Sequence, residues 1–302
     1  MLGKLIKNSF KANASAVYHN YIAMGVIAVI MLILMFVDWT KWGDRGVGMG
    51  LTIKVIAAAA LCLTAFIGIV LTFVSVFGEF KRSMYGNEGQ LTLTLPVRSS
   101  SLLFAKWLSG SFWVILSYTA FCLCAFGSLV YLLRHSAGII EGDPDYYSIY
   151  ALVSEMIRQI AESAGINAPN ITVVLNLVSI HAIIGGIRAC VFVLFVFFAV
   201  TLGNCRPFHK LGKVGYILYF FAVTFATHTV ASLFAKLLKV YIIVSENAFT
   251  FATSEADVQL AWSNGYGAVA ITNAYVTALL ALGVFLITAV LIDRKVNVTA
   301  ST

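Results

Sequence analysis

Few residues in the apolar part of this chain could do chemistry, and Arg188 is the clearest of them. It lies inside a long apolar run, two residues after Gly186, and His181 precedes it by seven residues on roughly the same helical face. His228 lies in the next apolar run. A charged side chain in the middle of a membrane costs about 2.5–3.5 kcal/mol on insertion scales, so it needs a compensating role. We expect Arg188 to face the bundle or a wet cavity and, with His181 and His228, to line a possible substrate path. Snorkelling or a structural pairing is the alternative.

Motifs for enzyme chemistry are missing from the sequence. It contains no GxSxG or HExxH pattern and no pair of carboxylates within an apolar run. The dipeptides Gly3-Lys4 and Gly212-Lys213 lack the upstream glycine and the following Ser or Thr of a phosphate-binding loop. The sequence therefore predicts no catalytic residue, no metal site and no cofactor of its own. If ATP drives this protein, another chain must bind it.

Composition indicates the elements that hold these side chains. The chain has 302 residues, of which 60% are hydrophobic and 11% are charged. Soluble domains are about 25% charged, so water cannot be the solvent for most of this surface. A membrane-crossing helix needs roughly 20 apolar residues. We predict an all-α, polytopic membrane protein that forms a single transmembrane domain over residues 1–302, with six spans at Asn20–Val37, Leu51–Phe77, Leu102–Leu133, Val173–Leu202, Val214–Ala235 and Gly267–Ile292.

Lysine and arginine are unevenly distributed between the predicted loops, which indicates the orientation. With the N-terminus inside, the inner segments carry net charge +9 and the outer segments −3, with Arg188 left within a span. Cytoplasmic loops hold the excess of basic residues. We expect a multi-pass protein of the cell membrane with both termini in the cytoplasm. The same distribution accounts for the formal charge of +7 without a nucleic-acid partner.

Two segments outside the spans have helical patterns. Residues 1–19 place Leu5 and Phe10 on one face and Lys4 and Lys7 on the other, which is typical of a helix lying in the lipid headgroup region. In the longest outer loop, apolar residues recur at helical spacing after Asp143-Pro144. We predict an amphipathic extracytoplasmic helix over Pro144–Ala164, acting as a scaffold or as a lid.

The segment after the second span is the most informative stretch. A charged turn with Glu79, Lys81 and Arg82 continues from the apolar helix, and Gly86, Asn87 and Gly89 favour a turn. We expect a short helix and turn on the cytoplasmic surface. Its mixed charge, with Met84 and Tyr85 exposed, suits a protein–protein contact.

Residues 86–106, which read GNEGQLTLTLPVRSSSLLFAK, resemble the run after the second span in bacterial ABC-2 family permeases of the Firmicute type. The turn that starts at Leu202-Gly-Asn-Cys and the closing Leu291-Ile-Asp-Arg-Lys are similar to that family's later loop and basic tail. Gln90, where an aromatic residue is commoner, and the turn Cys205-Arg206-Pro207 depart from the pattern. These departures leave the subfamily and the substrate open.

The resemblance implies a permease subunit of an ATP-driven ABC exporter, with ATP bound by a separate ATPase subunit. The N-terminal helix would be the elbow helix, and the segment after span two would hold the coupling helix. Two permeases, alike or different, would form the dimer that encloses the substrate path. The implied ATPase contacts are Glu79, Lys81, Arg82, Met84, Tyr85, Asn87 and Glu88. The alternative is a membrane protein without transport, either an immunity or sensor component or an intramembrane enzyme.

Overall fold

Six long helices dominate the computed structural model, which describes residues 2–36, 44–86, 98–137, 155, 158, 171–205, 212–246 and 248–300. Each contains a stretch long and apolar enough to cross a membrane. This confirms a mostly helical chain of the multi-pass membrane class. The helices are α1 (Leu2–Phe36), α2 (Asp44–Tyr85), α4 (Ser99–Ala137), α6 (Ile171–Gly203), α7 (Gly212–Leu237) and α9 (Thr272–Ala300).

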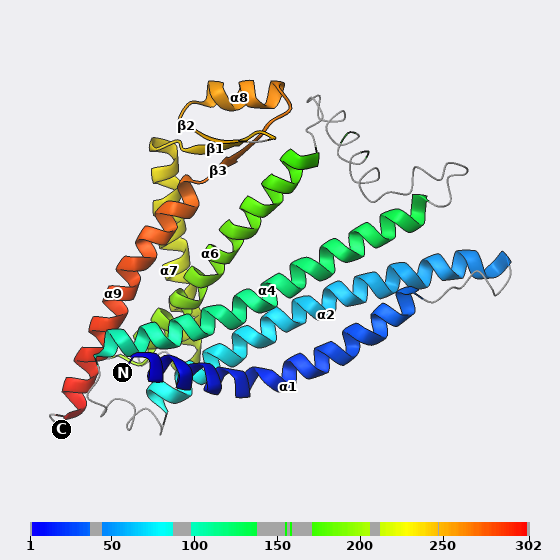
Figure 1. The fold of residues 1–302 in the computed structure, drawn as a ribbon. Coiled ribbons are helices and arrows are strands. Elements are labelled where there is room, and N and C mark those ends of the chain that lie inside the picture. Colours follow the sequence, from blue (N-terminus) through cyan, green and yellow to red (C-terminus); the bar gives the residue numbers. More distant parts are fainter. Residues whose placement is uncertain are drawn as a thin grey trace.

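The predicted interfacial helix over residues 1–19 is not a separate element. It forms the first part of α1, which runs unbroken from Leu2 to Phe36 and changes direction part-way along (Figure 1). Its apolar face packs on protein: Leu5 lies against the main core, and the ring of Phe10 lies 5.2 Å from that of Phe112 on α4. The predicted outer helix over Pro144–Ala164 falls outside the described residues, except for Glu155 and Arg158, which form an ion pair at 2.6 Å.

The helices form two groups of three. α1, α2 and α4 pack against one another, and so do α6, α7 and α9. Both chain termini lie at the same end of the bundle, here called the terminal end, and α4 and α6 spread apart towards the opposite, far end (Figure 1).

The largest buried cluster joins the two groups near the terminal end. It combines side chains from the end of α2, the first half of α4, the second half of α6 and the end of α9. Phe80 of α2, Leu103 of α4 and Phe197 of α6 are each at most 2% exposed. Close packing of buried apolar side chains holds elements in fixed relative positions. The end of α2 is therefore firmly attached to α6.

A small sheet caps the far end, so the prediction of an all-α chain is wrong there. Strands β1 (Tyr241–Val244), β2 (Phe249–Ala252) and β3 (Gly267–Ala270) form an antiparallel sheet in the order β2-β1-β3. Gly267, expected to begin the last span, instead pairs with Val244, and the helix starts at Thr272. A Cβ atom at Gly267 would lie 2.4 Å from Leu177 Cδ1, so this glycine lets β3 approach α6 closely.

The short helix α8 (Glu255–Ser263) lies over this sheet at the far end (Figure 1). The Ser254 hydroxyl accepts a hydrogen bond from the Ala256 amide at 3.1 Å and caps its start. Gly265 follows its end with φ 73°, a conformation that favours glycine. Lys239 donates a hydrogen bond to Glu255 at 2.6 Å, and this bond raises the pKa of Lys239 above its ordinary value.

Candidate functional site

The last turns of α2, residues Glu79–Tyr85, have two different faces. On one face Phe80 and Met84 are buried, with 2% and 1% of their surface exposed. On the other face the side chain of Arg82 is 64% exposed. This segment, here called the α2 end, thus presents a charged group outward from a helix that is anchored inward.

Two contacts anchor the α2 end to α6. The rings of Phe80 and Phe197 stack with their centroids 3.8 Å apart and their planes 6° from parallel. The Tyr85 hydroxyl donates a hydrogen bond to Thr201 Oγ1 at 3.0 Å, and the Thr201 hydroxyl in turn donates to the Phe197 carbonyl at 2.8 Å. The α2 end and α6 are therefore held together by both an aromatic stack and a hydrogen bond.

Glu79 is a buried acid, with only 8% of its side chain exposed. Its carboxylate accepts a hydrogen bond from Arg82 Nη2 at 2.8 Å, one turn further along the helix. A charge removed from water needs such a partner, since an unpaired buried charge is costly. The pair thereby connects the exposed guanidinium of Arg82 with the interior of the bundle.

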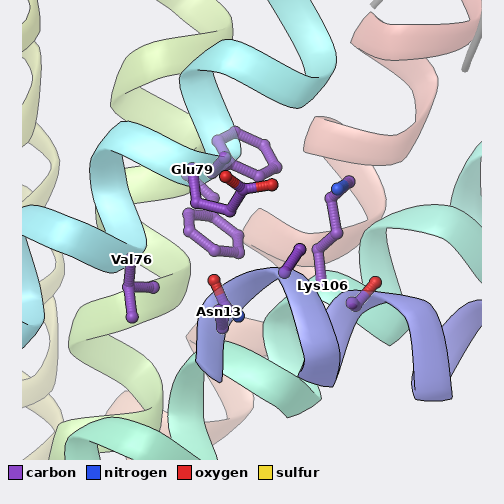
Figure 2. A pocket seen from close by; sticks show the side chains of 8 residues that line it. Asn13, Val76, Glu79 and Lys106 are labelled. Atoms are coloured by element: carbon purple, nitrogen blue, oxygen red, sulfur yellow. The ribbon is translucent and has the colours of Figure 1, made fainter. Parts of the chain in front are cut away.

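A small hollow beside Glu79 lies where α1, α2 and α4 meet. Figure 2 shows Asn13, Glu79 and Lys106, one from each helix, around it. Its volume is about 10 Å³, room for about one water molecule. Asn13 Nδ2 donates to Ser109 Oγ at 2.8 Å, whereas Asn13 Oδ1 is buried with no hydrogen-bond partner among the described residues. These polar groups tie the first part of α1 to the α2 end.

Lys81 connects the α2 end to α7. Its ammonium lies 4.6 Å from the centre of the Tyr216 ring, a cation–π contact. Both side chains border an apolar cavity of about 340 Å³ that Phe73, Phe77 and Phe220 also line.

The residues predicted to contact a partner therefore differ in how exposed they are. Arg82 is exposed, and Lys81 and Tyr85 are half-buried. Met84 and Tyr85 were expected to be exposed, which is wrong. Met84 lies in the main core because it falls on the same face of α2 as Phe80, and Tyr85 packs against that core. Glu79 is buried as well, and Asn87 and Glu88 lie outside the described residues.

A second site, here called the polar cavity, lies between α6, α7 and α9. It measures about 250 Å³ and is lined by Arg188, Val191, Phe192, Phe195, Thr224, Thr227, His228, Asn273 and Thr277. Arg188 and His228, which the sequence suggested for one path, thus meet at one cavity. His181 does not line it: its side chain is exposed, with Nδ1 2.9 Å from the carbonyl of Leu177.

The threonines and Asn273 of the polar cavity were not expected from the sequence. A usable signal exists, since Thr224 and His228 on α7, and Asn273 and Thr277 on α9, are each four residues apart. That spacing puts each pair on one helical face. Comparisons of the chain with protein-family models, curated proteins and solved structures find no match.

Proposed function

We propose that this chain is the permease subunit of an ATP-driven exporter and that a separate ATPase subunit docks at the α2 end, together with Asn87 and Glu88. The observation that carries the proposal is the construction of the α2 end. It combines an outward, 64% exposed Arg82 with an inward aromatic stack of Phe80 on Phe197. A docking site that drives movement needs both features.

The path from the α2 end to the polar cavity runs along a single helix. Thr201, which accepts the hydrogen bond from Tyr85, and Arg188, which lines the cavity, both belong to α6. At 1.5 Å per residue, the two positions are about 20 Å apart along the helix axis. A shift of the α2 end would move α6 as a rigid rod and so alter the cavity.

The proposal includes a second permease chain, the same or different, and places the terminal end in the cytoplasm. The excess of lysine and arginine in the loops at that end supports this orientation. ATP would be hydrolysed by the partner, and this chain would supply the substrate path, including Arg188 and His228.

The test is co-purification of the ATPase with a triple variant, Glu79→Gln/Arg82→Gln/Glu88→Gln. Both members of the Glu79–Arg82 pair are neutralised together, so neither is left as an unpaired buried charge. Loss of one charge-assisted hydrogen bond to a partner costs about 1.5–3 kcal/mol, so retained ATPase should fall about tenfold or more.

The matched control is Asp293→Asn/Arg294→Gln, an exposed pair at the end of α9 on the same end of the bundle. It should retain the ATPase at the wild-type level. Full ATPase retention by the triple variant would refute the docking site. A wild-type chain that purifies from mild detergent with no ATP-hydrolysing partner would instead favour a membrane protein without transport.

A further inference from the structure

The polar cavity is unusual for a membrane-spanning bundle because its charge is uncompensated by the side chains around it. Arg188 lies near the middle of the apolar stretch Thr172–Gly203. The guanidinium stays charged at any physiological pH. None of the described residues that line the cavity is acidic. An anion is therefore the ligand that this site lacks.

Hydrogen-bond donors surround the cavity on all three helices. His228 comes from α7 and Asn273 from the first turn of α9. The hydroxyls of Thr227 and Thr277 already donate to backbone carbonyls of their own helices, so these side chains add polar oxygens and no free donor. The hydroxyl of Thr224 is buried and has no hydrogen-bond partner among the described residues. A buried polar atom without a partner is destabilising, and a bound acceptor would remove that cost.

The size and surroundings of the cavity define the kind of anion. A volume of about 250 Å³ is well above that of one water molecule and below the range of about 300–1,000 Å³ for drug-sized ligands. Arg188 and His228 are exposed on the side of the bundle, next to the apolar side chains of Ile187 and Phe225, which are 43% and 75% exposed. In a membrane such a surface faces lipid. The cavity thus accepts a charged group from the side while an attached chain stays among the lipids.

We infer that the polar cavity binds the anionic, oxygen-rich headgroup of an amphiphile that enters from the bilayer. Arg188 offers a planar fork of donors that matches a phosphate or carboxylate with two hydrogen bonds. The inference names a substrate class for the proposed exporter and rests on that function for its role. Headgroup binding itself needs neither ATP nor a partner. A failure of headgroup binding can therefore be distinguished from a failure of the proposed exporter function.

The purified protein is placed in nanodiscs that contain equal amounts of phosphatidylglycerol and phosphatidylcholine. It is then released, and the lipids that stay bound to it are counted by native mass spectrometry. Wild type is expected to retain phosphatidylglycerol in preference to phosphatidylcholine. Arg188→Gln should retain at least about tenfold less, since it loses a charge-assisted pair. Lys236→Gln removes an exposed cation from the same bundle away from the cavity and should match wild type.

Asn273→Leu guards against a folding defect of the arginine variant, because it alters the cavity from α9 without removing a charge. It should retain less phosphatidylglycerol than wild type while remaining monodisperse. Equal retention by wild type and Arg188→Gln would overturn the inference, as would equal retention of both lipids. A parallel sample in inorganic phosphate tests the source: a bound phosphate ion in place of lipid would overturn the amphiphilic ligand.

Discussion

Phe80 occupies the position where the exposed part of α2 meets the shared core. Its ring is stacked on Phe197, and 2% of its surface is exposed. Two residues further, the guanidinium of Arg82 reaches outward. Two residues, less than one helical turn, thus separate the buried anchor Phe80 from the exposed charge of Arg82.

We expect Phe80→Ala to lower the free energy of unfolding by about 3–5 kcal/mol, because a large aromatic side chain is removed from a packed core. Unfolding in mixed detergent and dodecyl sulfate micelles measures this. Phe225→Ala is the matched control, since 75% of that ring is exposed and should face lipid. Its effect should stay below about 1 kcal/mol. Equal losses in the two variants would contradict the anchoring role of Phe80.

The free-energy cost of a polar group in an apolar run could be read from the sequence, whereas the packing of an apolar side chain such as Met84 could not. Arg188 and His228 stood out because polar groups in apolar runs are rare, and they line one cavity. Met84 was expected at the surface because its neighbours are charged. Its place in the core follows from a helix that continues to Tyr85 and turns Phe80 and Met84 to the same side. The charged residues of the α2 end indicated that this segment reaches the protein surface. The helical period determined which of its side chains are exposed there.

At the scale of elements, the three-stranded sheet at the far end connects the ends of α6, α7 and α9, which also pack against one another along their lengths. β1 follows α7, β3 precedes α9, and the α6 residue Leu177 packs against Gly267 of β3. Val244 in the central strand is fully buried. The sheet therefore fixes the far ends of α6, α7 and α9, the helices that line the polar cavity.

Gly265→Ala should destabilise this sheet, because a side chain at φ 73° costs about 1–2 kcal/mol. The measurement is hydrogen exchange of the β1 amides at Tyr241–Val244, which should exchange roughly 5- to 30-fold faster. Gly283→Ala on α9 is the control, since nothing lies within 4 Å of a Cβ atom there. Unchanged exchange in Gly265→Ala would show that the turn does not support the sheet.

The elements of the membrane region could be predicted from the sequence because apolar length alone specifies a span. The predicted Val214–Ala235, for example, lies within α7, Gly212–Leu237. The sheet was missed because its strands are only four residues long and border apolar helices. Gly267–Ala270 has the hydrophobicity of a span and differs from one only in that it pairs with β1. The β-branched and aromatic run Tyr241–Val244 was the available signal.

At the scale of the whole molecule, two three-helix groups are joined near the terminal end and diverge towards the far end (Figure 1). In the proposed function, such an arrangement would act as a hinge with its packed core near the proposed docking site. Tertiary packing of this kind could not be predicted from the sequence, because the hydrophobicity of a span does not specify which other helix it contacts. A small rotation at the α2 end would become a larger displacement between α4 and α6 at the far end.

The most direct measurement is the distance between spin labels at Leu123→Cys on α4 and Ile183→Cys on α6, two exposed positions, with the five native cysteines replaced. The chain is purified together with the proposed ATPase subunit and compared with and without ATP and Mg²⁺. We predict that ATP shifts the distance distribution and that Glu79→Gln/Arg82→Gln/Glu88→Gln abolishes the shift. A wild-type distribution that ATP leaves unchanged would contradict the account.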